Sequence, residues 1–161
     1  MCSSDLNTGD GIRMAVEAGA ALDSTLAQPA AWAPVSLVPQ TDGGRVPFPH
    51  FVDRNKPGFV IVDRRGRRFV NESDSYHLIV QAMFKASAAD ARIEAFVVAD
   101  HRAIRRYSMG VAPPFPGRLG PHLKSGYLTR AGTLRALGNA LGIDGEALEV
   151  NVERFNAAAR R

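Results

Sequence analysis

The sequence has little cysteine and no long hydrophobic run. Its 161 residues include a single cysteine, Cys2, which excludes an internal disulfide framework and makes a reducing, cytoplasmic compartment the default expectation. No stretch approaches the roughly 18–20 consecutive apolar residues that cross a bilayer, so we expect no integral membrane segment. The first residues also lack the apolar core of a signal peptide, and secretion therefore has no support.

Metal-ligand spacing and strong charge are missing as well. The four histidines follow no spacing typical of a metal site, and no metal is expected; they are His50, His77, His101 and His122. The net charge is only +4. Four arginines flank Gly66 in the run Arg64–Arg68, a pattern that could bind nucleic acid. Because no aromatic residues interleave them, we interpret the run as a solvated hairpin tip and expect no nucleic-acid partner.

What remains is an ordinary globular balance of 45% hydrophobic and 22% charged residues, which excludes a wholly disordered chain. Ten prolines and fifteen glycines imply long connections. The prolines of residues 28–58 forbid long helices there and permit only short edge strands. Residues 1–6 resemble the translated end of a sequencing adapter, and we expect the natural sequence to begin near Asn7, inside a longer gene.

Hydrophobic periodicity predicts an α+β fold. Asp10 is expected to be the N-cap of a short first helix, and Ser75 is one of several caps available to a second. Thr133 and Asp144 are expected to cap the last two helices, the first of which ends at Gly142. Between the first helix and Thr133 we expect a hairpin, with strand 58–62, turn 63–66 and returning strand 67–70. After the hairpin we expect a helix over 76–85, a central strand over 95–99, a short helix over 102–107 and a loop over 110–125.

Three stretches, in the same order, resemble one family. Residues 7–15 (NTGDGIRMA) look like the "TGDG-then-helix" segment of flavoproteins related to fumarate reductase and succinate dehydrogenase. Residues 57–72 resemble the family's "G-x-RF-x-NE" strand and turn. Residues 125–144 and 152–156 resemble its "A-x-TL…LGID…RFN" closing stretch. Three such motifs in register are far more specific than any one alone.

The resemblance implies a fragment of a two-domain, FAD-dependent oxidoreductase. Residues 7–28 would form the last helix of the central part of a Rossmann-like FAD domain, and residues 29–161 a capping, or substrate, domain. No G-x-G-x-x-G follows a strand, so the pyrophosphate cradle would lie outside this chain and the isolated fragment is expected to be inactive.

The same resemblance assigns Thr8, Gly9, Asp10 and Gly11 to cofactor binding. It implies that Asp10 lies beside the FAD and that Thr8, Gly9 and Gly11 let the backbone approach the cofactor closely. The alternative is an ordinary N-cap with flexible glycines. A cap alone does not require two glycines, which favours the contact with FAD.

Tyr76 is the candidate catalytic residue. It stands four residues after Glu72, where soluble fumarate reductases carry the arginine that protonates a bound dicarboxylate. The 3-ketosteroid dehydrogenases and their relatives look similar to this chain here, with a tyrosine in the active site. A phenol can act as general acid or base if its pKa is lowered from about 10. The alternative is that Tyr76 only packs in a first helical turn. Asn71 and Glu72 are expected to fix the corner before it.

The expected substrate is a small hydrophobic carbonyl compound. The His-Pro-Thr signature of succinate and fumarate enzymes is missing, and its nearest counterpart, residues 28–34, is apolar and aromatic. Trp32 and Tyr127 are candidate substrate residues, although plain packing competes for both. The resemblance thus implies a 3-ketosteroid-like dehydrogenase that places a double bond next to a carbonyl, passes hydride to FAD and uses an unknown electron acceptor. The alternatives are a fumarate-reductase-like enzyme that reduces an unsaturated acid or enone, and a non-catalytic basic binding module.

Overall fold

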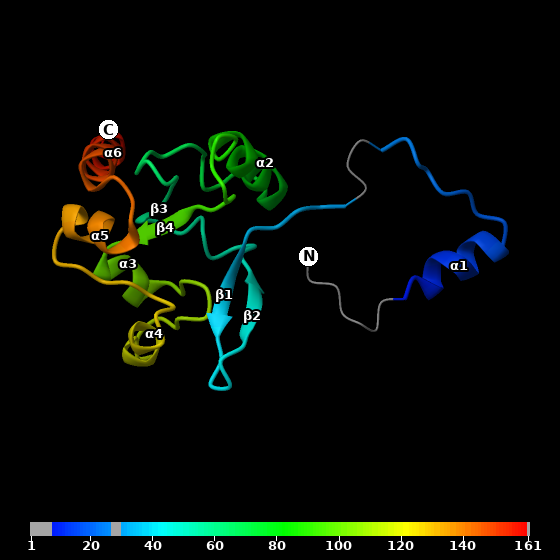
Figure 1. Cartoon of the computed structure of the whole chain (residues 1–161), viewed down its shortest axis with the longest axis horizontal. Coiled ribbons are helices and arrows are strands. Elements are labelled where there is room, and N and C mark those ends of the chain that lie inside the picture. The colour runs from blue at the N-terminus through cyan, green and yellow to red at the C-terminus, as the bar shows by residue number, and fades with distance from the viewer. Residues whose placement is uncertain (1–7, 27–29, 161) are drawn as a thin grey trace. The chain divides into compact units, whose positions relative to one another are not determined.

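The computed structural model describes residues 8–26 and 30–160, so the adapter-like segment, Asn7 and the dipeptide Gln28-Pro29 lie outside the described residues. The chain divides into two units, one ending at Ala31 and one beginning at Trp32. Helix and sheet are mixed, as the sequence predicts. The elements in chain order are α1 (Asp10–Glu17), β1 (Val35–Pro39), β2 (Arg45–Pro49), β3 (Phe59–Val62), α2 (Tyr76–Ala86), β4 (Phe96–Ala99), α3 (His101–Arg106), α4 (Gly120–Lys124), α5 (Leu134–Leu141) and α6 (Gly145–Ala158) (Figure 1).

Among the described residues of the first unit, α1 is the only helix or strand. Its N-cap is Gly9, at φ 80°, and Asp10 is the first helical residue, so the prediction that Asp10 caps the helix is wrong. The reason is local: the Asp10 carboxylate accepts hydrogen bonds from the Thr8 hydroxyl and the Arg13 guanidinium instead of backbone amides. The apolar side chains of Ile12 and Val16 are exposed.

The proline-rich stretch forms the antiparallel hairpin of β1 and β2, with Val35 opposite Pro49 and Pro39 opposite Arg45. These are the short edge strands that the prolines permit. The prediction for this stretch is therefore confirmed.

Strand β3 pairs with β4, not with the residues that follow it in sequence. The predicted turn is present, with Gly66 at φ 67°, but the returning strand over 67–70 is reduced to one bridge between Val62 and Arg68. Asp63 N–H still donates to the Arg67 carbonyl at 3.0 Å. The next amide on that edge, Ile61 N–H, donates to the Glu72 carboxylate at 2.9 Å. A side chain thus takes the place that a second strand would occupy.

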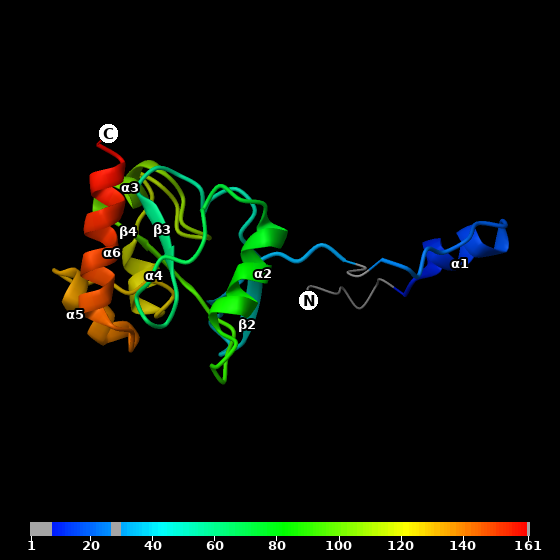
Figure 2. The same ribbon diagram turned by 90° about the horizontal axis from the view of Figure 1, so that it is seen from above.

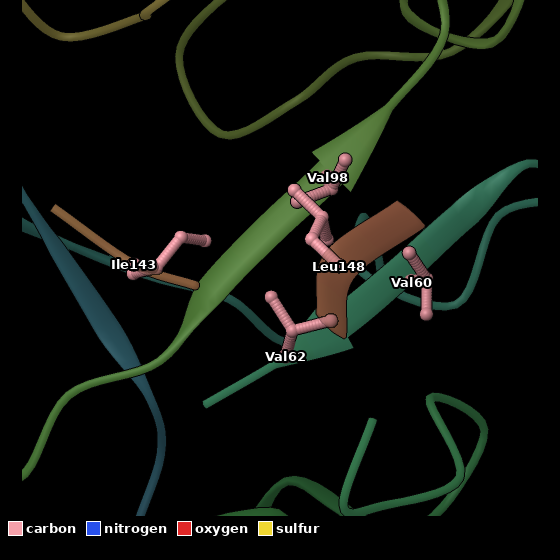
Figure 3. Packing of buried hydrophobic residues seen from close by; sticks show 5 residues of the cluster. All are labelled: Val60, Val62, Val98, Ile143 and Leu148. Carbon is pink, nitrogen blue, oxygen red and sulfur yellow. The ribbon is translucent and has the colours of Figure 1, made fainter. Parts of the chain in front are cut away.

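The β3–β4 sheet lies between α2 on one side and α5 and α6 on the other (Figures 1 and 2). The prediction of a central strand over 95–99 is wrong in the described part of the chain, where β4 pairs with β3 alone. Its apolar character reflects burial by helices. Alternate residues of β3 contribute to a cluster with residues of β4 and the C-terminal segment (Figure 3): Val60, Val62, Val98, Ile143 and Leu148.

The predicted helices are otherwise found close to their expected bounds. Ser75, Thr133 and Asp144 each accept a backbone amide as N-caps, and Gly142 ends α5 at φ 70°. Helix α4 interrupts the expected loop over 110–125 because Pro121 stands in its first turn, where proline is compatible with a helix. Gly66 fits closely against α6: a Cβ there would lie 2.4 Å from the Asp144 carbonyl.

Candidate functional site

Tyr76 begins α2, directly after a turn whose backbone is held at several points. The Asn71 side chain accepts the amide of Ser73 at 3.1 Å, and the Asn71 carbonyl accepts that of Asp74 at 3.0 Å. The Ser75 hydroxyl then caps the helix by accepting the Leu78 amide at 3.3 Å. These contacts fix where the first residue of the helix stands.

Glu72 locks this turn to the sheet. It is buried, accepts the Ile61 amide, and forms an ion pair with Arg68 at 2.6 Å. Burial works against its charge, but the hydrogen bonds from Arg68 and Ile61 hold the pKa of Glu72 below its ordinary value. The expected role of Asn71 and Glu72 in fixing the corner is confirmed.

Arg54 is a third component of the corner, and sequence reasoning missed it. Its guanidinium is buried and donates to the carbonyls of Glu72 and Asp74, both at 2.7 Å. Arg54 lies in the proline-rich connection, 22 positions before Tyr76, so no local pattern relates the two. The sequence around it, His50 to Lys56, is largely polar and carries a second cation, so nothing there singled Arg54 out.

The ring of Tyr76 packs edge-on against Phe51, with centroids 5.2 Å apart. The residue is 36% exposed, and its hydroxyl makes no hydrogen bond to any residue that the structure describes. The ring is therefore held against Phe51 while the residue as a whole is partly exposed. This is the arrangement required of a group that exchanges a proton with a bound molecule.

Trp32 lies along the same helix. Its ring packs edge-on against Phe84 at 4.9 Å, and its backbone amide donates to the His77 ring at 3.2 Å. Phe84 follows Tyr76 by eight positions, or about 12 Å along a helix. The structure thus brings two of the predicted residues, Tyr76 and Trp32, to one helix, each beside an exposed aromatic partner.

Tyr127 does not join them. Its hydroxyl lies 2.8 Å from the Ser36 hydroxyl and accepts the Val111 amide at 3.4 Å. The Ser36 hydroxyl is also 2.8 Å from the His50 ring. The polar end of Tyr127 is thus engaged inside the chain, and its part in substrate binding stays a prediction.

The predicted cofactor residues form the start of α1: Thr8 and the N-cap Gly9 precede the helix, and Asp10 and Gly11 are its first two residues. Thr8 donates to Asp10 at 2.6 Å, and the Arg13 guanidinium pairs with the same carboxylate. These contacts, that from Thr8 first, lower the pKa of Asp10. The left-handed backbone conformation at position 9 favours glycine. Gly11, by contrast, is an ordinary helical residue, and a Cβ there would meet nothing within 4 Å in the described structure.

The arginine run is engaged with acidic residues. Arg65 pairs with Asp90 at 2.9 Å, Arg64 with Glu94, and Arg68 with Glu72. Two hollows lie where this run meets α6, both bordered by Arg68 and Arg154 and neither by Tyr76. Across residues 8–26 and 30–160 no three acidic, histidine or cysteine side chains gather as metal ligands, and none of the helices there has the length and apolarity to cross a membrane.

Comparison with known proteins identifies what this arrangement is similar to. The chain is 36% identical over 152 residues to a 4-oxocyclohex-2-ene-1-carboxylate 5-dehydrogenase of Sinomonas cyclohexanicum, an alignment that covers 94% of this chain and 26% of the relative. It is also 36% identical over 160 residues to a 3-oxosteroid 1-dehydrogenase of Mycobacterium tuberculosis, covering 96% and 27%. The chain therefore spans about a quarter of the length of these relatives.

The comparison with solved structures agrees with the comparison of sequences. A crystal structure of 3-ketosteroid delta1-dehydrogenase from Sterolibacterium denitrificans, in complex with 1,4-androstadiene-3,17-dione, matches with a TM-score of 0.68 and 28% identity, over 98% of this chain and 28% of that one. The family model described as FAD binding domain matches residues 1–161. The chain accordingly belongs to the FAD binding domain family, which confirms the flavoprotein resemblance and FAD as the cofactor.

Proposed function

We propose that this chain is part of an FAD-dependent dehydrogenase that introduces a double bond next to the carbonyl of a hydrophobic ring ketone. The observation that carries the proposal is Tyr76, a partly exposed tyrosine whose ring packs against Phe51 and whose preceding turn is held by Arg54. The names of the relatives support it, since each names an oxo-substituted ring compound and a dehydrogenase. Residues 29–161 would belong to the capping domain, and residues 7–28 to the FAD domain.

Tyr76 is the proposed proton acceptor. Acting as a general base, it takes a proton from the carbon beside the carbonyl, so that the C–H electrons pass into the forming double bond. The hydrogen on the adjacent carbon then leaves with its electron pair, and bound FAD supplies the acceptor for that hydride. Trp32 and Phe84 would add an apolar surface along α2 for the remainder of the substrate.

Thr8–Gly11 are the proposed contact with FAD. The turn fits an edge of the cofactor, because an exposed carboxylate, Asp10, stands beside open glycine backbone at a helix N-terminus. Gly11 is unfavourable inside a helix by about 1 kcal/mol relative to alanine. No neighbouring atom in the described structure requires it. A glycine that the fold itself does not need supports close approach by a ligand.

The test is Tyr76→Phe in the flavoenzyme that carries this chain. Removing only the hydroxyl should lower turnover of a 3-oxosteroid by about 10²–10⁴-fold, while the flavin content stays that of the wild type. Tyr107→Phe is the matched control, since that tyrosine is the C-cap of α3 and its ring packs against Arg106, and it should leave turnover unchanged. Unchanged turnover of the Tyr76→Phe enzyme would remove Tyr76 from the mechanism.

A reductase of the same family, working on an unsaturated acid or enone, is the second candidate. Anaerobic mixing distinguishes the two reactions: a saturated ring ketone should bleach the oxidised flavin, whereas an unsaturated carboxylate should reoxidise the reduced flavin only if the enzyme is a reductase. The lack of a cation at position 76 favours the ketone. The ion pairs of Arg64, Arg65 and Arg68 argue against a basic binding module.

A further inference from the structure

A chain of hydrogen bonds runs through the second unit beside the corner of Tyr76. The His50 ring lies 2.7 Å from the Asp53 carboxylate through Nδ1 and 2.8 Å from the Ser36 hydroxyl through Nε2. The Ser36 hydroxyl continues to Tyr127 at 2.8 Å. The side chains of His50 and Asp53 are only 12% and 10% exposed. These hydrogen bonds are therefore largely shielded from water, and hydrogen bonds in such a shielded environment are strong.

Every group in this chain has a matched partner when His50 is neutral. Burial disfavours the charge on Asp53, but the His50 ring and the Gly110 amide, at 2.8 Å, hold the pKa of Asp53 below its ordinary value. The ionised carboxylate then accepts from Nδ1–H. Nε2 in turn accepts from the Ser36 hydroxyl, whose oxygen accepts from Tyr127.

Gly110 shows how closely these groups are packed. A Cβ at this position would lie 1.9 Å from the Tyr127 hydroxyl and 3.1 Å from the His50 ring, and the residue has a φ of 57°. Both the space and the backbone conformation thus require glycine. The result is an anchor that joins β1, the segment after β2 and the loop around Gly110.

The anchored segment, residues 50–54, leads directly to Tyr76. Phe51, between His50 and Asp53, packs against the Tyr76 ring. Arg54, next to Asp53, holds the carbonyls of Glu72 and Asp74, the latter two positions before Tyr76. This five-residue segment therefore holds Tyr76 in two ways: Phe51 packs against the tyrosine ring, and Arg54 holds the backbone turn before the tyrosine.

Carboxylate, imidazole and hydroxyl also occur in this order in hydrolases that use a serine nucleophile. Here the serine oxygen is engaged on both sides, by His50 and by Tyr127, and it is only partly exposed. That arrangement holds a serine in place and leaves it poorly placed to attack a substrate.

We propose that His50 and Asp53 are positioning residues for Tyr76, which act by fixing Phe51 and Arg54 against it. This inference rests on the proposed function, because it assigns Tyr76 the proton transfer. It predicts that loosening the anchor lowers the rate of the chemical step and leaves substrate binding nearly intact. A misplaced reacting group is costly even when the change is remote.

The experiment is a double-mutant cycle in the flavoenzyme, read as the rate at which a 3-oxosteroid bleaches the flavin under anaerobic conditions. His50→Ala should lower this rate by about tenfold with KM changed less than about twofold. His50→Gln, which keeps a donor and an acceptor, should recover part of the loss. In the Tyr76→Phe background, His50→Ala should have little further effect, because the group that it positions is already gone. His101→Ala, on the exposed start of α3, is the matched control.

The outcomes separate the two proposals. If Tyr76→Phe has no effect, the proposed function fails and this inference fails with it. If Tyr76→Phe is slow and His50→Ala is not, or if their effects multiply, only the positioning role is overturned. Should His50→Ala not fold, Tyr127→Phe replaces it in the same cycle, since it removes only the far hydroxyl of the anchor, and a multiplicative effect again overturns the inference.

Discussion

The two turns that resemble flavoprotein motifs both open a helix, but they are built in opposite ways. Before α2, the polar groups of Asn71, Glu72 and Ser75 are satisfied by the chain itself, and Glu72 is buried. Before α1, the backbone turns at Gly9 and Asp10 is exposed. The first turn is specified by contacts within this chain. The second has local contacts too, from Thr8 and Arg13 to Asp10. It also keeps Gly11, which no neighbouring atom in the described structure requires, and that glycine is the physical basis for proposing a ligand there.

The largest loss of stability is expected from a substitution at Glu72. Glu72→Ala should lower the free energy of unfolding by about 2–4 kcal/mol, because the buried amide of Ile61 loses its acceptor and Arg68 loses its partner. The measurement is chemical denaturation followed by circular dichroism.

The matched control for Glu72 is Glu94→Ala. It removes the partner of Arg64 in a partly exposed pair and should cost no more than about 1 kcal/mol. Equal losses in the two variants would mean that the Glu72 contact is no stronger than a surface ion pair, and that the corner is not held from within.

Smaller effects are expected from a substitution at Gly11, which should stabilise α1 but weaken FAD binding. Gly11→Ala should stabilise α1 by up to about 1 kcal/mol, because alanine is the better helix former and a Cβ meets nothing there. If FAD approaches this turn, the same substitution should weaken FAD binding by about tenfold.

Titration of the apo-flavoenzyme with FAD, followed by flavin fluorescence, measures that affinity. Gly120→Ala, at another glycine with open space around it, should leave the affinity unchanged. An unaltered FAD affinity in the Gly11→Ala enzyme would return both glycines to the alternative of a flexible helix start.

The contrast between the two turns also explains what the sequence could predict. The caps Ser75, Thr133 and Asp144 act within three residues of themselves, and local pattern was sufficient to place their helices. Asp10 has the same chemistry, yet its carboxylate is drawn to Thr8 and Arg13, and Gly9 takes the cap position. Local pattern shows which residues can cap and leaves open the competition among their neighbours.

The errors made at longer range have a different cause. The residues expected to form a returning strand could pair with β3, but the side chain of Glu72 takes the amide that they would have used. Similarly, Arg54 reaches the turn before Tyr76 from a connection that carries no helical or strand period. Such contacts depend on how the chain folds back on itself, which periodicity along one strand or helix does not contain.

The smallest expected effect is a dependence of stability on pH, which should differ between Glu72 and Asp10. The folded chain holds the pKa of Glu72 below its ordinary 4.5, so Glu72 stabilises the fold fully above that pH and less as the pH falls through its lowered folded value. Denaturation of the wild type and Glu72→Gln from about pH 6 to about pH 3 should therefore show curves that converge in acid. Asp10→Asn should run parallel to the wild type, because that carboxylate is fully exposed and water screens its contacts. If Asp10→Asn converged with the wild type as strongly as Glu72→Gln, the turn before α1 would be held from within after all, and the reason for assigning it to FAD would be lost.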